Sequence, residues 1–319
     1  MSESSTAAVK RKKSPPHKKT LQGKPLGKRI AESWQLYLLL LIPIIITIIY
    51  KYIPMYGIQI AFRDYKPRQG FFGSKWVGFE WFERFFAAPN FKRMIVNTVK
   101  LSVYGLLWSF PVPIILSLAI NQIRFKRYKR VVQTILYAPH FISIMVVCGM
   151  IRIFLSPYGG LVNLLTGGQV DFMTIPGAFR TIYIASGIWQ DAGWGTIIYL
   201  ATLSAVDPGL YEAAKIDGAS MFQRIIHIDL PELLPMIILQ LIMSASGIMS
   251  VGFEKVFLLQ TELNKGASDV IAVYVYQQGI VDHMYSYSTA IGLFNTVINI
   301  ILLIIVNKIA KKAANVSFV

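Results

Sequence analysis

The chain has 319 residues, of which 54% are hydrophobic, with a mean hydropathy of +0.51 and a formal net charge of +16. Repeated apolar stretches of about 20 residues exceed what a soluble core needs, so the composition excludes an ordinary soluble protein and predicts an all-α integral membrane protein. The basic excess could indicate nucleic-acid binding, but no nucleic-acid-binding motif accompanies it, and basic runs beside membrane helices usually face anionic headgroups. We therefore expect membrane lipid, and no nucleic acid, as a partner.

The N-terminal residues 1–30 are rich in lysine and poor in apolar side chains, which predicts a basic, disordered tail. The apolar run that follows is long enough to span a membrane, and no small-residue cleavage site follows it. We therefore expect an uncleaved signal anchor and not a signal peptide. A membrane domain is predicted over residues 31–312, followed by a short C-terminal tail at 313–319.

Six stretches are long and apolar enough to cross about 30 Å of hydrocarbon as helices. They are 34–53, 95–120, 131–155, 181–205, 233–259 and 287–307. The fourth is interrupted by the polar sequence SGIWQDAGWG. An even number of spans puts both termini on one side, and most lysines and arginines fall on that side, which favours the cytoplasm. The basic segment 63–93 on the other side opposes this bias.

Catalytic and metal-binding patterns are scarce. One cysteine, Cys148, cannot form an intramolecular disulfide and suggests no Cys-based metal site. The chain has no P-loop sequence, and no nucleophile, base and orienting group occur together, so neither an ATPase nor another enzyme is expected. His140, which follows Pro139 inside a span, either lines a polar path or bonds to a backbone carbonyl freed by the proline.

The segment 206–231 lies between two apolar stretches yet mixes acids, bases, small residues and prolines. Asp207 before Pro208 predicts a helix start. Gly218 predicts its end, because glycine adopts positive φ without strain. Ser220 with Gln223 three residues later forms a capping-box pattern, which predicts a second helix to about His227. Pro231 would then lie near the start of the fifth span, where a missing amide costs little.

This helical hairpin has two physical interpretations. Ala213 and Ala214 would let another surface approach the backbone closely, while Glu212 and Asp217 would offer it charge. The alternative is an ordinary amphipathic loop that lies on lipid headgroups.

The spacing within the hairpin resembles the EAA signature of permease subunits from bacterial binding-protein-dependent ABC importers. The matching positions are Glu212, Ala213, Ala214, Gly218, Ile228, Leu230 and Pro231. The sequence DPGLYEAAKIDGAS also resembles the sugar-importer branch, in which an aspartate precedes this glycine. The resemblance runs from about residue 34 to 312: WVGFEWFERF is similar to the first outer loop, APHFIS to the third span and VGFEKVFLLQ to the last two spans. TELNKGASDV stands where many sugar permeases have a Gly-Gly-Pro turn. That difference points to the multiple-sugar, lipoprotein-associated and alginate-oligosaccharide permeases.

The resemblance implies a six-helix MetI-like permease with cytoplasmic coupling helices, located in the bacterial cytoplasmic (inner) membrane with both termini inside. It also implies the partners: two copies of an ABC ATPase, a second homologous permease forming a heterodimer, an extracytoplasmic solute-binding protein and an oligosaccharide. The chain itself needs no cofactor, because ATP and Mg bind the ATPase. Closure of the ATPase dimer would draw the hairpins together and convert the path from inward-open to outward-open.

The resemblance assigns ATPase coupling to Glu212, Ala213, Ala214, Gly218, Ile228, Leu230 and Pro231, and the charge of Asp217 beside this patch adds that residue to the set. Polar residues inside spans are costly and face a cavity or one another. The candidates for the translocation path are therefore Asn121, His140, Trp189, Gln190, Asp191, Trp194, Gln240, Asn295 and Asn299. The two tryptophans could stack on sugar rings, or they could pack against helices or lie in an interfacial belt. No metal ligands are predicted.

Two features concern the outer side. The aromatic and basic segment 63–93 is expected to form an interfacial helix and part of the surface that receives the binding protein. Glu254 and Lys255 either contact that protein or mark the membrane boundary by extending to water.

Two alternative functions stay open. The chain could serve an importer for peptides, amino acids or another nutrient, because the hairpin signature is shared across substrates. It could also be a non-transport sensor subunit, for which an additional soluble signalling domain would be expected.

Overall fold

The computed structural model describes residues 33–314; the predicted basic tail 1–30 and residues 315–319 of the predicted C-terminal tail lie outside the described residues. Helices dominate, and one two-stranded sheet is present in the described part of the chain. The predicted all-α architecture is confirmed. The chain divides into two units, residues 1–57 and 58–319.

The described part of the first unit is a single apolar helix. It consists of α2 (Trp34–Thr47), the π-helical turn η1 (Ile48–Tyr52) and α3 (Ile53–Met55), and it continues into the 3-10 helix η2 (Tyr56–Phe62). None of the side chains in α2 is buried. A helix that is apolar on all sides and uncovered requires lipid or another apolar surface around it.

Within residues 33–314, four helical segments are long and apolar enough to cross a membrane: Trp34–Phe62, Phe91–Asn121, Met221–Ala245 and Tyr285–Ile309. A fifth candidate is the pair Lys126–Phe141 and Ile144–Phe154, which is bent by 93°. The predicted fourth span coincides with α11 (Pro176–Ser204), which has 29 residues but is more polar, as its interrupted sequence indicates.

Two predicted spans are not single straight helices. The third comprises α8 (Lys126–Tyr137), η3 (Ala138–Phe141) and α9 (Ile144–Phe154), because Pro139 ends the first part and Ser143 caps the next. The fifth stretch, 233–259, is interrupted too. There α14 (Leu230–Ser246) gives way to an irregular loop, 247–252, before α15 (Phe253–Leu259). Glycines at both ends of this loop account for the break.

The segment 63–93 is only partly the expected interfacial helix. It begins with strands β1 (Arg63–Asp64) and β2 (Lys75–Trp76), which pair antiparallel with Arg63 opposite Trp76. The short helices α4 (Gly70–Gly73) and α5 (Glu80–Phe86) complete it. Aromatic stacking between Phe62 and Trp76, with ring centroids 5.6 Å apart, holds the strands against the preceding helix.

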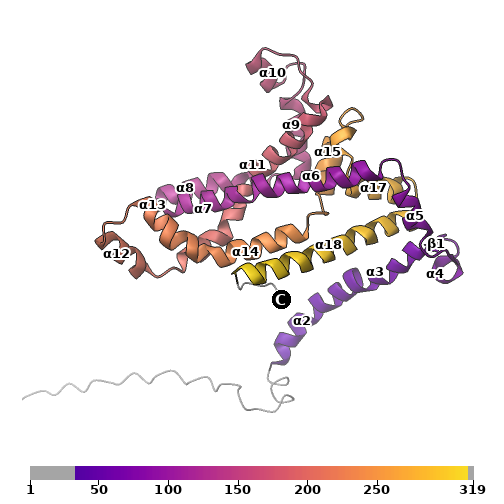
Figure 1. Ribbon diagram of the computed structural model, residues 1–319, viewed down its shortest axis with the longest axis horizontal. Helices are drawn as coiled ribbons and strands as arrows, with labels where there is room; N and C mark the ends of the chain where they lie inside the picture. Colours follow the sequence, from indigo (N-terminus) through magenta and orange to yellow (C-terminus); the bar gives the residue numbers. More distant parts are fainter. Residues whose placement is uncertain (1–32, 315–319) are drawn as a thin grey trace, which may run out of the picture. The chain divides into compact units, whose positions relative to one another are not determined.

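The second unit packs around a few long helices. α6 (Phe91–Ser109) and α7 (Pro111–Asn121) continue one another, α7 packs along α11, and α14 packs along α18 (Tyr285–Ala314) (Figure 1). One buried cluster joins α7, α11 and α14 and contains Ile120, Tyr199, Leu200, Leu203 and Leu233. Figure 1 shows α12 and α13, the helices of the hairpin, at one end of this unit and α5 at the other.

The other connecting elements are short. They are α10 (Leu161–Thr166), η4 (Phe172–Thr174), α12 (Pro208–Ile216), α13 (Met221–Arg224), η5 (Ile225–Asp229), α16 (Lys265–Ser268), α17 (Ile271–Tyr276) and η6 (Gln277–Val281). Polar contacts fix α16 and α17 to α6: the Arg93 guanidinium lies 2.7 Å from the Asp269 carboxylate, and the Asn97 amide donates to the Gly266 carbonyl at 3.0 Å. These bonds hold the start of α6 in place.

Candidate functional site

The first arm of the hairpin, residues 206–231, forms as its local sequence predicts. The Asp207 carboxylate accepts a hydrogen bond from the Gly209 amide at 2.9 Å, and Pro208 occupies the first turn of α12. The chain reverses at Gly218, whose φ is +74°. The Ala219 amide donates to the Ala214 carbonyl at 2.8 Å, which closes the helix end. The predicted helix start and bend are confirmed.

The second arm starts as predicted but does not end near His227. Ser220 and Gln223 form the complete capping box, with the Ser220 amide donating to the Gln223 side chain at 2.7 Å. Beyond α13 the helix continues through the π-helical turn η5 directly into α14. The prolyl ring of Pro231 would clash with the carbonyl four residues earlier in a regular helix, and the wider turn accommodates it. The second arm and α14 therefore form one continuous helix.

The surface of the hairpin offers small, charged and apolar groups together. Glu212, Ala213, Asp217, Gly218, Leu230 and Pro231 are exposed, whereas Ala214 and Ile228 are half-buried. Ile216 and Phe222 are also exposed, at 86% and 70%. Apolar side chains exposed beside charges are consistent with a surface that contacts a protein or a membrane.

At the base of the hairpin lies Asp229, a buried carboxylate that sequence reasoning missed. It accepts hydrogen bonds from the Gln122 amide at 2.8 Å, the Asn121 amide at 3.5 Å and the Tyr211 hydroxyl. Burial, and then the bond to Asp229, raise the pKa of Tyr211 to about 12, so its hydroxyl stays a donor at neutral pH. Asn121, predicted for the path, belongs to this network.

A second cluster joins α11 to η3. The His140 Nδ1 lies 2.9 Å from the Asp191 carboxylate, and the imidazole stacks on the Trp194 indole with centroids 4.4 Å apart. His140 therefore bonds a carboxylate through this nitrogen and not a carbonyl freed by proline. The Asp191 side chain is 66% exposed and Trp194 is 42% exposed. A carboxylate on a membrane helix avoids lipid, so this face requires water or a polar partner.

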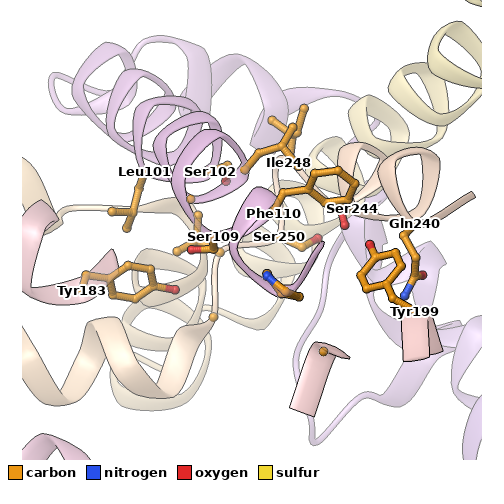
Figure 2. A pocket seen from close by; sticks show the side chains of 17 residues that line it. Leu101, Ser102, Ser109, Phe110, Tyr183, Tyr199, Gln240, Ser244, Ile248 and Ser250 are labelled. Carbon is orange, nitrogen blue, oxygen red and sulfur yellow. The ribbon is translucent and has the colours of Figure 1, made fainter. Parts of the chain in front are cut away.

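Between α6, α7, α11 and the end of α14 lies a cavity of about 400 Å³. Figure 2 shows Tyr183 on one side and Tyr199 with Gln240 on the other, with serine side chains between them. None of the seventeen lining residues is charged. Hydroxyl groups, an amide and aromatic rings without charge suit a neutral polar ligand such as a sugar ring.

The other residues predicted for the path have different surroundings. Of the nine, only Gln240 lines this cavity. The Asn299 side chain accepts from the Met249 amide at 3.1 Å and donates to the Ser250 hydroxyl at 2.9 Å, so it holds the loop 247–252. The Gln190 amide donates to the Ile142 carbonyl at 2.8 Å. Trp189 is exposed, and the Asn295 Oδ1 is buried without a partner in the described part of the chain.

Lys255 does not extend to water as the sequence suggested. Glu254 beside it is exposed, but Lys255 is only 7% exposed, and its ammonium lies 5.0 Å from the centre of the Tyr183 ring. Gly187 on α11 leaves room for it, because a Cβ there would lie 3.3 Å from the Lys255 Nζ. Within residues 33–314 this ammonium makes no ion pair, which leaves a buried positive charge beside the cavity wall.

Metal-binding groups are absent from residues 33–314: no three histidine, cysteine, aspartate or glutamate side chains lie close enough to hold an ion. The site therefore consists of an exposed hairpin, a polar network at its base, and a hydroxyl-lined cavity with a buried cation behind one wall.

Comparison with known proteins gives consistent relatives. A family model described as binding-protein-dependent transport system inner membrane component matches residues 109–315. Protein LplB of Bacillus subtilis is 44% identical over 285 residues, 88% of this chain and 89% of that protein. The polygalacturonan/rhamnogalacturonan transport system permease protein YteP of the same species is 41% identical, covering 92% of this chain and 93% of YteP.

Solved structures match as well. A chain of a bacterial ABC transporter involved in the import of the acidic polysaccharide alginate superposes with a TM-score of 0.82 at 40% identity, over 91% of this chain and 100% of that chain. A chain of the bacterial alginate transporter in complex with an alginate pentasaccharide-bound periplasmic protein gives 0.83 at 39% identity, over 92% and 100%.

Proposed function

The chain belongs to the family of inner-membrane components of binding-protein-dependent transport systems, and we propose that it forms one half of the path of an ATP-driven bacterial importer for an acidic oligosaccharide. The predictions of a MetI-like fold and of a transport component without enzymatic activity are confirmed. The proposed assembly contains a second permease, two ATPase subunits that bind ATP and Mg, and an extracytoplasmic binding protein. The hairpin and both termini face the cytoplasm.

The cavity supports the oligosaccharide class. Its lining of tyrosine rings, serine hydroxyls and the Gln240 amide offers stacking surfaces and hydrogen-bonding groups without charge, as sugar rings require. YteP and the alginate transporter are named for polysaccharides, and each is about 40% identical to this chain over nine-tenths of its length. A peptide or amino acid would also need an anionic partner for its ammonium terminus, and the lining residues include no carboxylate.

The buried Lys255 ammonium is the observation that supports an acidic oligosaccharide as the substrate. A charge removed from water without an opposite partner is costly, so a bound carboxylate would relieve this cost. Lys255 lies against Tyr183, a residue of the cavity wall, so movement of that ring would bring the ammonium to the cavity. The face formed by the half-buried His140 and the exposed Asp191 and Trp194 would meet the second permease and complete the path.

The hairpin supplies the coupling. Glu212 pairs with a basic residue of the ATPase, Ala213 and Ala214 permit close docking, and the bend at Gly218 separates the two arms. Because the second arm is continuous with α14, whose residues Gln240 and Ser244 line the cavity, a displacement of the hairpin reaches the cavity wall directly.

Copurification tests the assembly. The tagged chain is extracted gently from its native membrane, and the accompanying proteins are identified by mass spectrometry. We expect a P-loop ATPase and a second permease, and loss of the ATPase from a Glu212→Lys/Gly218→Asp variant. Recovery of neither partner, under conditions that keep other membrane complexes intact, would make a lone membrane protein the better interpretation.

Uptake tests the substrate. Cells that lack the chain are complemented with the wild type, Lys255→Met, or the control Lys265→Met, which removes a lysine paired with Glu262. We expect wild-type cells to take up labelled oligogalacturonate or alginate oligosaccharide, and Lys255→Met alone to lower this uptake about tenfold, the order of one charge-assisted bond. Equal uptake of a neutral maltooligosaccharide would contradict the proposal that the importer selects acidic oligosaccharides. Uptake of a tripeptide alone would favour the peptide importer, and uptake of no probe would favour the sensor.

A further inference from the structure

The hairpin arm that should dock the ATPase is weakly packed. None of the nine residues of α12 is buried. A cavity of about 360 Å³ lies beside it, lined partly by Gln122, Tyr211 and Arg224. Apolar packing therefore does little to hold α12 in place, and its position depends on a few specific contacts.

The contact that holds α12 is the Tyr211 hydroxyl, which donates to the buried Asp229 carboxylate. The same carboxylate accepts from Gln122, at the end of α7, at 2.8 Å. Asp229 is thus an acceptor shared by the docking arm and α7. Pro113 of α7 lines the hydroxyl-lined cavity of about 400 Å³ described above. The residue is fully buried, and it ends the π-helical turn η5. Single π-helical turns within α-helices are frequent at functional sites.

We propose that Asp229 is a positioning residue that clamps the ATPase-docking helix α12 to the end of α7. This inference rests on the proposed coupling role of the hairpin. With the clamp closed, a displacement of α12 moves α7 as well as α14. Both helices contribute residues to the hydroxyl-lined cavity of about 400 Å³, so two parts of its wall move. With the clamp open, α12 is held by its two chain connections and by its weak packing, and it can move while α7 stays in place.

The clamp depends on one side chain that accepts hydrogen bonds on both of its oxygens. The Tyr211 hydroxyl donates to one carboxylate oxygen and the Gln122 amide donates to the other, so the carboxylate serves both donors at once with charge-assisted bonds. In Asp229→Asn, either Gln122 has to turn its amide or Tyr211 has to accept instead of donating, and both bonds lose the charge that strengthens them. Changing Gln122 to glutamate as well restores an acceptor opposite the new NH2, so the double variant rebuilds the link with its polarity reversed.

The test uses the complete importer, purified with its copurifying subunits, in proteoliposomes. The variants are Tyr211→Phe, Asp229→Asn and Gln122→Glu/Asp229→Asn, with Tyr158→Phe as a control at an exposed tyrosine. Two quantities are measured: hydrogen exchange of the amides at 209–217, and labelled oligogalacturonate transported per ATP hydrolysed. We expect Tyr211→Phe and Asp229→Asn to speed exchange about tenfold, the order of one hydrogen bond to a charged group. We also expect both to lower the transport ratio severalfold, and the double variant to recover both quantities.

Unchanged exchange and an unchanged ratio in Tyr211→Phe would overturn the proposal, as would failure of the double variant to improve on Asp229→Asn. If Asp229→Asn does not assemble, Tyr211→Phe decides alone, since it removes one hydroxyl and keeps the ring. A wild-type complex that transports no oligogalacturonate would count against the proposed function. The comparison of amide hydrogen exchange between the wild type and the variants would still test the clamp.

Discussion

Gly193→Ala tests the closest approach between α11 and α8. A Cβ built on Gly193 would lie 2.0 Å from the Leu136 carbonyl oxygen and 2.9 Å from the Leu136 Cβ. Ordinary contact requires about 3.5 Å. The two helices would therefore have to separate by about 1.5 Å, which is the difference between contact distance and the 2.0 Å available.

This separation would reach the cluster at η3. Because η3 follows α8 without a break, His140 moves with Leu136. Its Nδ1 lies 2.9 Å from Asp191, and a shift of about 1.5 Å takes that distance beyond a hydrogen bond. Overpacking of this kind costs about 1–3 kcal/mol, which corresponds to about 5- to 150-fold in the population of the native arrangement.

The assay is thermal unfolding of the purified complex, together with uptake by complemented cells. The control is Gly177→Ala in the same helix, where an added Cβ meets nothing within 4 Å and alanine removes the conformational cost of glycine. We expect Gly193→Ala to lower the Tm by about 2–10 °C relative to this control and to reduce uptake. Equal Tm and uptake in the two variants would refute the argument that this crossing positions His140.

Three further predictions concern the hairpin. Gly218→Val should lower the recovery of the ATPase in copurification, because φ of +74° strains a β-branched residue, whereas Gly218→Asn should retain most of it; equal recovery would contradict this. Ser220→Ala should speed amide exchange at 221–223 about fivefold through loss of about 1 kcal/mol of capping, and Ser220→Thr should not. The raised pKa of Tyr211, about 12 against 10.0, means that its donor is fully present below pH 10 and is lost as pH rises through about 12. The protection of the α12 amides against hydrogen exchange, corrected for the pH dependence of the intrinsic exchange rate, should therefore stay constant from pH 7 to 9. A fall in protection in that range would contradict the role of the Tyr211 hydroxyl as the donor.

The hairpin could be predicted from sequence because its determinants are local. The cap at Asp207, the bend at Gly218 and the box at Ser220 each depend on groups within a few residues, so spacing alone specified them. The end of the second arm was missed for a related reason. A proline normally interrupts a helix, and nothing in the neighbouring sequence indicates that a π-helical turn will accommodate Pro231.

The polar residues of the spans were harder to assign, because a polar group in a membrane helix can face a cavity or satisfy the protein itself. Asn121 and Asn299 do the latter: one reaches Asp229, 108 residues away, and the other holds the backbone of the loop after α14, 50 residues away. Such pairings depend on tertiary contacts that spacing does not encode. Asp229 was overlooked for the same reason, since its donor Gln122 lies 107 residues earlier.

The loop 247–252 forms part of the cavity wall and follows the helix that leads from the hairpin. Irregular backbone at membrane depth is tolerated where it lines a cavity and its amides are satisfied. This loop lines the cavity, and Asn299 on α18 satisfies the Met249 amide. The loop follows α14, which is continuous with the hairpin, while α7, which contributes Pro113 to the cavity wall, meets the hairpin through Asp229. Two walls of one cavity thus lead to one exposed hairpin, so a single displacement there can change the width of the cavity instead of shifting it as a whole.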